Sequence, residues 1–509
     1  MNKTLISTGS MEATQAATTM IEEGGNAFDA AVSAVFTSMT SEFALTGPAG
    51  GGAMLVKTPN ADPLVYDFFV NTPRQTTTDN MEFFKAEINF GSSKQFFHIG
   101  KGSVAVPGTL AGLIQIHSDL GKLPLSLILQ PAVTLAKNGC KMNREQAYVF
   151  KILQPIFIHT PEGRQLLCRN EATLKEGEIF KNPDFAFFLN RVIDEGTDFF
   201  YKGDIADEIV SLLSEGGLLD KKSLSAYTVE KRKPIITDFY GYKVYSNPPP
   251  SAGGSLILFL LKLINKGNAA DFSPTHLLHA MAVTNKARQE ICKDPNNPEL
   301  FYALLDKKVF TQFKAALTSE LSESSSRPVE PGRGCTTHVS VMDKEGNCAS
   351  VTTSNGEGSG YIIPNTGIML NNMLGEEDLN PQGFHNWTKP RRLPTMMSPT
   401  LILKENIPEM VVGSGGSNRI RSAIVQVILN YFCQGYSLEE SIKAPRMHFE
   451  EGILYCEPGI IPFNMTSPPE EVILKEFKNK NLFFGGVNAV TRNAAFSDRR
   501  RGGTTVILD

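Results

Sequence analysis

A threonine follows directly after a stretch of sequence that has little to bury. Residues 317–334 are rich in Ser, Glu, Pro and Gly, which predicts an exposed loop. Cys335 and Thr336 come next, and residues 337–342 then alternate in the manner of a β-strand. Thr336 therefore lies where an amide between a loose loop and a rigid strand can be strained and attacked.

A threonine hydroxyl is a weak nucleophile unless a base lies beside it, and one such base is the residue's own α-amine. That amine is free only if the backbone is cut between Cys335 and Thr336. A free α-amine has a pKa of about 7.7–8, so it titrates near neutral pH and can act as a general base. The sequence thus suggests a threonine nucleophile that is created by cleavage of the chain.

The residues after Thr336 predict a β-hairpin. A four-residue turn at 343–346 (DKEG) would fold residues 337–342 back on 348–352. This register places Thr336 opposite Thr353, with a tolerance of about one residue. The hairpin would therefore bring further polar side chains next to the nucleophile.

Three of those side chains are candidates for the site. Thr353 or Ser354 could hydrogen-bond the Thr336 hydroxyl, and Asn355 could hold polar groups of a substrate. The alternative is an ordinary surface hairpin, in which threonine is present for its β-propensity and His338 is only a strand residue. The hairpin alone does not decide between these interpretations.

Several other kinds of site are excluded by the sequence. It contains no G-x-S-x-G elbow, no P-loop, no complete G-x-G-x-x-G and no H-E-x-x-H. Lys plus Arg is 49 and Asp plus Glu is 53, so the net charge is −4. The densest basic run, 499–501, is short and is followed by glycines, which predicts a solvated loop. We expect neither a nucleic-acid partner nor a metal or organic cofactor.

The cysteines and the apolar stretches indicate a compartment. The seven cysteines form no CxxC pair, and an odd, scattered set is typical of reduced thiols. Residues 255–264 form the longest apolar run, which is too short to span a bilayer and contains Lys262. We therefore expect a soluble cytoplasmic protein with no membrane partner.

The periodicity of the chain predicts the elements that would position the site. Residues 11–23 and 27–39 read as two helices, with Asn26 capping the second and Asp29 in its first turn. A strand is expected at 53–56, directly after three glycines. Further helices are expected at 110–120, 126–137, 145–154, 256–264, 274–291, 422–432 and 437–444, with Pro155 ending the third of them. Further strands are expected at 337–342, 348–352, 367–370, 401–404, 410–412 and 504–508. Because helices and strands do not alternate regularly, stacked layers are favoured over a doubly wound sheet.

Seven motifs in a fixed order resemble the γ-glutamyltransferase family and cover nearly the whole chain. They are EEGGNAFDAAVSAVF (22–36), GPAGGGAMLV (47–56), SVAVPGTLAGL (103–113), YSNPPPSAGG (245–254), TTHVSVMDKEGNCASVTTSNGEGSG with TGIMLNN (336–372), MSPTLIL (397–403) and GSGGSNRI (413–420). So many ordered motifs are specific, and they favour the nucleophile over the surface hairpin.

The resemblance implies a four-layer αββα fold of the N-terminal-nucleophile hydrolase type, in the α/β (α+β) class. It implies one precursor that is cleaved between Cys335 and Thr336 into a large subunit, 1–335, and a small subunit, 336–509, which form one catalytic unit. It also implies a two-step acyl transfer, in which Thr336 takes a γ-glutamyl group as an ester. Water or an acceptor amine then releases that group.

The resemblance also assigns roles around the nucleophile. The backbone N–H groups of Gly415, Gly416 and Ser417 would bind the oxyanion, a task that needs no side chain. Asn355 and Glu376 fall near the groups that hold the substrate α-amine. Thr395 stands at the first of two paired serines of the family, so one hydroxyl remains at that substrate-binding position.

Departures from the family pattern concern recognition of the glutamyl group. Phe69 stands where the family has the Arg that clamps the substrate α-carboxylate, and Met373 replaces a polar amine-binding residue. Between residues 372 and 397 the chain is also short for the lid loop of some relatives. A guanidinium suits a carboxylate, so Arg74, Arg391 or Arg392 could replace the missing clamp.

Three functions remain open at this stage. The first is an intracellular γ-glutamyltransferase-like enzyme that acts mainly as a hydrolase on glutathione or other γ-glutamyl amides. The second is an acylase with the same nucleophile but another acyl group, such as a glutaryl or poly-glutamyl chain. The third is a non-catalytic relative that never matures and serves as a binding or scaffold protein. The expected partners are a small-molecule donor and an acceptor amine or water, and assembly beyond the two subunits is left open.

Overall fold

The computed structural model describes most of the chain. The described residues are 2–89, 94–265, 273–294, 297, 299–315, 317, 335–380, 383–460 and 472–509. The predicted exposed loop at 317–334 lies outside the described residues, apart from Leu317.

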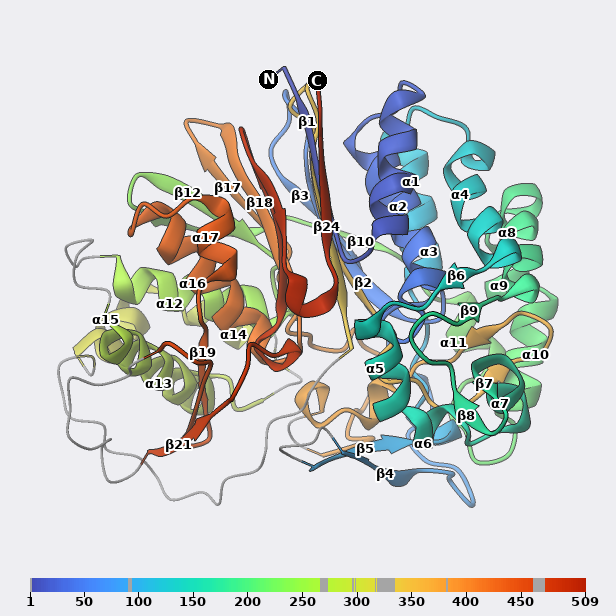
Figure 1. Cartoon of the computed structure of the whole chain (residues 1–509). Coiled ribbons are helices and arrows are strands. Elements are labelled where there is room, and N and C mark those ends of the chain that lie inside the picture. Colours follow the sequence, from blue (N-terminus) through green and yellow to red (C-terminus); the bar gives the residue numbers. More distant parts are fainter. Residues whose placement is uncertain are drawn as a thin grey trace.

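Two antiparallel sheets pack face to face at the centre of the molecule (Figure 1). The order in the seven-stranded sheet is β10 (Glu230–Arg232), β3 (Leu64–Phe68), β2 (Gly51–Lys57), β14 (Cys348–Ser354), β13 (Thr337–Met342), β1 (Thr4–Thr8) and β24 (Thr504–Leu508). The order in the six-stranded sheet is β11 (Ile235–Phe239), β12 (Tyr242–Ser246), β17 (Thr400–Lys404), β18 (Ile407–Gly415), β22 (Gly486–Thr491) and β23 (Ala495–Ser497).

Helices cover the outer face of each sheet (Figure 1). On the seven-stranded side these are α1 (Met11–Glu22), α2 (Ala27–Ser41), α3 (Thr109–Leu120), α4 (Leu125–Asn138) and α8 (Pro183–Glu195). On the six-stranded side they are α12 (Ala252–Ile264), α13 (Pro274–Ile291), α16 (Arg419–Phe432) and α17 (Leu438–Lys443). This arrangement confirms the expected four-layer αββα fold.

Smaller elements lie around the four layers. The short helices are α5 (Arg144–Ile152), α6 (Gln154–Phe157), α7 (Pro161–Leu167), α9 (Asp198–Tyr201), α10 (Asp204–Leu212), α11 (Lys221–Ser225), α14 (Glu299–Ala303) and α15 (Lys307–Ala315). The outlying strands are β4 (Phe84–Asn89), β5 (Lys94–Ile99), β6 (Cys140–Lys141), β7 (Cys168–Arg169), β8 (Ala172–Thr173), β9 (Ile179–Phe180), β15 (Ile362–Ile363), β16 (Ile368–Met369), β19 (Met447–Glu450), β20 (Ile453–Cys456) and β21 (Ile473–Glu476). The 3-10 turns are η1 (Lys101–Ser103), η4 (Met373–Gly375), η5 (Glu377–Leu379), η6 (Leu482–Phe484) and η7 (Arg499–Arg501).

The α1–α2 pair forms as the sequence predicts. Asn26 accepts from the backbone N–H of residues 28 and 29, and Asp29 accepts from the Asn26 N–H, so a complete capping box starts α2. Every residue of α2 is buried, which confirms the expected burial of its Ala- and Val-rich sequence. Pro155 lies in the first turn of α6, and α5 ends at Ile152, as a proline at that position requires.

The space between the two sheets is apolar in the middle and polar near the start of β13. Leu5, Leu55, Leu401 and Val411 belong to one buried cluster that draws on both sheets. His338 lies beside it, with Nδ1 2.7 Å from Thr352 Oγ1 and Nε2 2.9 Å from Ser340 Oγ. Burial lowers the pKa of His338 to about 3, so its ring is neutral at physiological pH. His338 therefore has a packing role in the strand.

The cysteines and the helices bear on two expectations about the whole chain. All seven cysteines are described, and all are free thiols. In the part of the chain that the structure covers, every helix is too short or too polar to cross a bilayer.

Candidate functional site

The peptide bond between Cys335 and Thr336 lies directly before β13. Thr336 is 4% exposed, so the bond is buried near the junction of the two sheets. Ser354 Oγ donates a hydrogen bond to the Cys335 carbonyl oxygen, and it accepts one from Gly356 N at 3.0 Å. A fixed donor on this carbonyl polarises the bond that a nucleophile at Thr336 would attack.

The hairpin register differs by one residue from the predicted one. Thr353 pairs with Thr337 and not with Thr336. The turn is one residue longer than expected because the Asp343 carboxylate accepts from Asn347 N at 2.9 Å and draws it into the turn. Thr353 consequently faces the segment that follows α2, where its Oγ1 lies 2.8 Å from Thr46 Oγ1. Ser354, and not Thr353, reaches the Cys335–Thr336 bond.

The predicted oxyanion segment packs directly on Thr336. A Cβ on Gly415 would overlap the Thr336 carbonyl oxygen, so only glycine allows this approach. Gly416 has φ +127°, a conformation that favours glycine, and Ser417 has φ +50°. The Ser417 hydroxyl donates to Asp378, which also accepts from Asn418 Nδ2 at 2.9 Å. This turn is therefore anchored by its side chains while its glycine backbone faces the nucleophile.

Two buried acids, Glu357 and Glu376, lie near the scissile bond. Gly356 has φ +63° and no room for a Cβ, which would lie 2.5 Å from Glu376 Oε1. Burial raises the pKa of Glu357 to about 8, and burial with the nearby charges of Glu357 and Asp378 raises the pKa of Glu376 well above its usual range. Among the described residues, neither Glu357 Oε1 nor Glu376 Oε1 has a hydrogen-bond partner.

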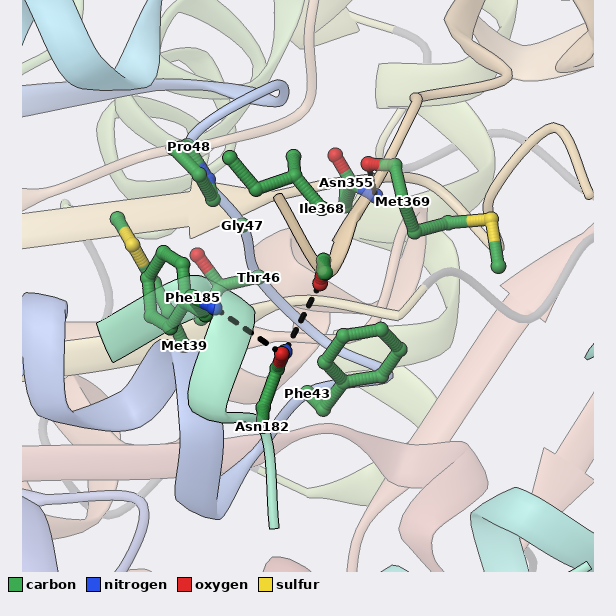
Figure 2. Close-up of a pocket in the computed structure, with 11 residues that line it drawn as sticks. Met39, Phe43, Thr46, Gly47, Pro48, Asn182, Phe185, Asn355, Ile368 and Met369 are labelled. Carbon is green, nitrogen blue, oxygen red and sulfur yellow. Dashed lines mark hydrogen bonds between the residues drawn. The ribbon is translucent and has the colours of Figure 1, made fainter. Parts of the chain in front are cut away.

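Asn355 is turned away from the scissile bond. Its Nδ2 donates to the Met369 carbonyl at 3.0 Å, and its Oδ1 has no partner within the described part of the chain. Figure 2 shows Asn355 at the wall of a cavity of about 10 Å³, which it lines with Phe43, Thr46 and Asn182 among others. A cavity of this size holds about one water molecule. The structure thus places Asn355 beside the site but not in contact with Thr336.

Thr395 lies in the loop that leads into β17. Its hydroxyl accepts from Met397 N at 3.1 Å, and its carbonyl accepts from Ser251 Oγ at 3.0 Å. The hydroxyl of Thr395 therefore stabilises this loop, and its carbonyl joins the loop to the segment before α12. The same loop contributes Met397 to the apolar cluster around Phe69.

Phe69 belongs to an apolar wall that includes Met373, Leu379 and Met397. A Cβ on Gly51 would lie 3.0 Å from the Phe69 ring, and Gly51 pairs with Ser354 in the neighbouring strand. The ring thus packs on Gly51, in the strand next to β14, and lies on the same sheet as the scissile bond. The position expected for a carboxylate clamp is apolar in this chain.

The arginines proposed to replace the clamp are differently placed. Arg392 donates to the Phe69 carbonyl, to Tyr227 Oη at 2.6 Å and to Thr228 O at 2.8 Å. Arg74 is half-exposed, 3.7 Å from an Asp220 carboxylate oxygen. Arg391 lies beside Arg392, and its backbone N–H donates to Thr72 Oγ1 at 3.0 Å. The buried guanidinium of Arg392 is therefore occupied by hydrogen bonds within the protein, beside the apolar wall, and is poorly placed to bind a substrate carboxylate.

In the basic run at 499–501, Arg499 is exposed as its composition predicted, but Arg500 and Arg501 are not solvated. The Arg500 side chain, which is 4% exposed, pairs with the carboxylates of Glu457 and Asp498, at 2.5 and 3.2 Å. Arg501 donates from Nη1 to the Thr336 carbonyl oxygen at 3.2 Å. The correction follows from the burial of Glu457, in a distant segment, and of Asp498, directly before the run, which the local sequence does not reveal.

Sequence reasoning also missed three acids near the site, Glu42, Glu357 and Asp378. Glu42 is an isolated acid, Glu357 lies among glycines and Asp378 follows two other acids, and the importance of each depends on burial that only the tertiary structure supplies. The one available signal was the polar run at 354–357, which follows a buried strand.

Comparison with known proteins places this arrangement in a family. The profile of the family described as Gamma-glutamyltranspeptidase matches residues 13–508. The chain is 31% identical over 498 residues to a "Glutathione hydrolase proenzyme" of Escherichia coli (strain K12), covering 91% of this chain and 85% of that protein. It is 30% identical over 450 residues to an "Acylase ACY 1 proenzyme" of Pseudomonas sp. (strain SE83), covering 86% and 81%.

Solved structures agree with this placement. The cephalosporin acylase from Bacillus halodurans superposes with a TM-score of 0.83 over 99% of this chain and 96% of that chain, at 21% identity, which shows the shared fold. The Helicobacter pylori gamma-glutamyltranspeptidase gives a TM-score of 0.54 at 26% identity, covering 62% of this chain and 91% of that chain. The chain is a member of the γ-glutamyltranspeptidase family and an enzyme of the N-terminal-nucleophile hydrolase type.

Proposed function

We propose that the chain cuts itself between Cys335 and Thr336 and that the freed Thr336 then cleaves γ-glutamyl amides. In the first reaction, Thr336 Oγ attacks the Cys335 carbonyl carbon, the C–N bond breaks, and the nitrogen takes up the hydroxyl proton. Water then hydrolyses the resulting ester, which leaves a Cys335 carboxylate and a free α-amine on Thr336. The position of Ser354 on the same carbonyl supports this step.

In the second reaction the α-amine takes the proton of Thr336 Oγ, and the oxygen attacks the γ-carbonyl of the donor. The donor's amine leaves with a proton, and the γ-glutamyl group remains as an ester on Thr336. Backbone N–H groups of the Gly415–Gly416–Ser417 turn would stabilise the negative oxygen of each tetrahedral intermediate. Water or an acceptor amine then releases the acyl group.

The observation that carries the γ-glutamyl assignment is the pair of unpartnered carboxylate oxygens on Glu357 and Glu376, within the part of the chain that the structure describes. Buried acceptors without donors are costly, and two neighbouring buried carboxyls resist ionisation. An ammonium group bound between them would supply hydrogen bonds and a compensating charge. The free α-amine of a γ-glutamyl donor is such a group, and a plain glutaryl chain has none.

The relatives support the same mechanism, since several are named as proenzymes and as glutathione hydrolases. We accordingly assign residues 1–335 to a large subunit and 336–509 to a small subunit of one αββα unit. Our assignment of the oxyanion role to Gly415, Gly416 and Ser417 also rests on the place of Gly415 against Thr336.

The proposal is tested with purified protein and the Thr336→Ala variant. We expect wild-type protein to give two unequal bands on a denaturing gel, a small subunit whose first residue is Thr336 by mass spectrometry, and release of chromophore from a γ-glutamyl anilide. Thr336→Ala should stay as one band and release none. Wild-type protein that stays full-length and yet cleaves the anilide would contradict the mechanism.

A second candidate function, an acylase for other acyl groups, is favoured by the apolar wall around Phe69 and by the commitment of Arg392. The two candidates differ in the α-amine, so a γ-glutamyl anilide and a glutaryl anilide separate them. Under our proposal, Glu376→Gln should raise KM for the γ-glutamyl compound by about tenfold or more, because one charged hydrogen bond to the substrate is lost. KM for the glutaryl compound should change little. Preferred cleavage of the glutaryl anilide by the wild-type enzyme would establish the acylase instead.

A further inference from the structure

Glu42 is a buried acid in direct contact with the residue that follows the nucleophile. It caps the C-terminal end of α2 and is 1% exposed. Thr337 Oγ1 lies 3.2 Å from its Oε1 and 3.0 Å from its Oε2, so the hydroxyl donates to this carboxyl group. Thr337 and Thr336 share a peptide unit, which places the carboxyl beside the backbone of residue 336.

The backbone at Gly9 packs closely against this carboxyl group. A Cβ on Gly9 would overlap Glu42 Oε1 and would lie 2.7 Å from Thr337 Oγ1. Glycine at position 9 therefore makes room for the contact. The contact joins the segment before α1, the end of α2 and the start of β13, three segments that are distant in the sequence.

The charged and titratable groups around Glu42 come from several elements. Glu12 lies on α1, Cys140 on β6 and Arg501 on η7. Burial raises the pKa of Glu42 to about 7, while the hydroxyls of Ser38 and Thr337 and the charge of Arg501 act in the opposite direction. Glu42 therefore changes charge in the pH range in which an α-amine also titrates.

Arg501 approaches the same backbone through a different group. Its Nη1 donates to the Thr336 carbonyl oxygen, whereas Glu42 accepts from the Thr337 side chain. The start of β13 is thus held between a buried carboxyl group and a partly buried guanidinium group. Such charges act strongly on a neighbouring titratable group because the surrounding protein screens them poorly.

We propose that Glu42 is a positioning residue, which holds the start of β13 through Thr337 and sets the base strength of the α-amine that cleavage frees on Thr336. This inference rests on the proposed cleavage before Thr336 and deepens it. A nearby negative charge favours the ammonium form, so ionised Glu42 keeps the amine protonated to higher pH and makes it a stronger base. Removing that charge should make the amine lose its proton at lower pH.

The test measures the α-amine itself and needs no substrate. Mature wild-type enzyme and Glu42→Gln are treated briefly with acetic anhydride across a pH series, and mass spectrometry gives the acetylated fraction of the peptide that begins at Thr336. We expect the midpoint of acetylation to fall by about one pH unit in Glu42→Gln, since an opposite charge at short range shifts a pKa by about 1–3 units. The acidic limb of kcat/KM for the γ-glutamyl anilide should move by the same amount.

The outcomes separate this inference from the proposed function. If no peptide begins at Thr336 in the wild-type protein, the proposed cleavage fails. If that peptide is present and its midpoint is the same in wild type and Glu42→Gln, the role of Glu42 is overturned.

Two substitutions of Thr337 give an independent test should Glu42→Gln not mature. Thr337→Ser keeps the hydroxyl and should keep the wild-type midpoint. Thr337→Val removes the donor, so Glu42 ionises at higher pH and the midpoint should fall by a smaller amount. Equal midpoints in Thr337→Ser and Thr337→Val would overturn the inference, because the coupling is assigned to that hydroxyl.

Discussion

One hydroxyl holds the bond that the chain is proposed to cut. Ser354 Oγ is oriented by the Gly356 N–H and donates to the Cys335 carbonyl oxygen. The neighbouring Thr353 hydroxyl points to the opposite face of the strand, toward Thr46. Two adjacent side chains of similar chemistry therefore have different consequences, because successive residues of a strand face opposite ways.

Ser354→Ala is expected to slow self-cleavage by about 10²–10³-fold, the cost of removing one fixed donor from a developing oxyanion. The rate is measured as the conversion of one band into two on a denaturing gel after folding. Thr353→Val is the matched control and should mature at close to the wild-type rate. Equal slowing of both variants would show that the effect comes from the strand and not from the hydrogen bond.

The raised pKa of Glu42 also predicts how the free energy of unfolding depends on pH. Its pKa is about 7 in the folded chain against 4.5 for an unperturbed glutamate, so between these values the folded state holds a proton that the unfolded state lacks. This contribution is fully present below pH 4.5 and is lost as the pH rises to about 7. The loss amounts to about 3 kcal/mol. Glu42→Gln should therefore become more stable relative to its parent over that range.

The free energies of unfolding of Glu42→Gln and its parent are compared by urea unfolding at about pH 5 and pH 7.5, an interval that covers most of the titration of Glu42. A Thr336→Ala background keeps the chain in one piece. Glu23→Gln, an exposed acid after α1, serves as the control. If Glu42→Gln changes the free energy of unfolding by the same amount at both pH values, the predicted proton uptake is contradicted.

Single residues could be predicted where their role follows from the local sequence. Ser354 could be predicted to lie next to residue 336 because both are on one hairpin, but its Oγ donates to the Cys335 carbonyl oxygen where a bond to the Thr336 hydroxyl was expected. The role of Thr336 as nucleophile stays a prediction. Glu42 and Glu357 could not be found, because their chemistry arises from burial by segments far away in the sequence. Asn355 was assigned to the substrate, whereas its amide is held by Met369.

At the scale of elements, the β13–β14 turn sets which hydroxyl meets the scissile bond. The Asp343 carboxylate accepts from Glu345 N at 3.0 Å, from Asn347 N at 2.9 Å and from Ala27 N at 2.9 Å. It thus fixes the length of the turn and also joins it to the start of α2. A turn shorter by one residue would move Ser354 to the opposite face.

Asp343→Ala should lower the free energy of unfolding by about 2 kcal/mol or more, because it leaves buried N–H groups without acceptors. It should also slow self-cleavage by loosening the register. Urea unfolding in the Thr336→Ala background measures the first effect, and the denaturing gel measures the second.

Glu345→Ala is the control in the same turn. Its carboxylate pairs with Lys122 at 2.9 Å, and both side chains are about half-exposed. Exposed pairs contribute about 0–1 kcal/mol, so this variant should unfold and mature almost as the wild type does. A larger effect of Glu345→Ala than of Asp343→Ala would contradict the role given to Asp343.

Elements with strong periodicity were predicted well. The helix at 274–291 and the strands at 337–342 and 504–508 have the predicted bounds. The hairpin register was off by one residue because the side chain of Asp343, and not the backbone pattern, decides the turn. Short strands such as β10 and β21 were missed, since a few half-exposed residues carry almost no alternation.

At the scale of the whole molecule, the two proposed subunits are interleaved. β1 of the large subunit lies between β13 and β24 of the small one, and β14 pairs with β2. In the second sheet, β12 of the large subunit pairs with β17 of the small one. Both sheets therefore depend on strands from each subunit.

The two subunits should remain together after cleavage and elute as one species of about 56 kDa per pair in gel filtration, with both bands in the same fractions. Separation should require denaturant, since it breaks several strand ladders and exposes the core between the sheets. Elution of either subunit alone in native buffer would contradict the interleaved assembly.

The ends of the chain also meet, since Thr4 pairs with Leu508 and Lys3 Nζ lies 3.1 Å from an Asp509 carboxylate oxygen. A circular permutation can therefore join residue 509 to residue 2 through a short flexible linker and open the chain at 335/336. Such a protein would begin at Thr336 once its initiator methionine is removed, so translation and not self-scission would create the reactive amine. Cleavage of the γ-glutamyl anilide by this permuted form would show that activity requires the free amine of Thr336 but not the self-cleavage reaction.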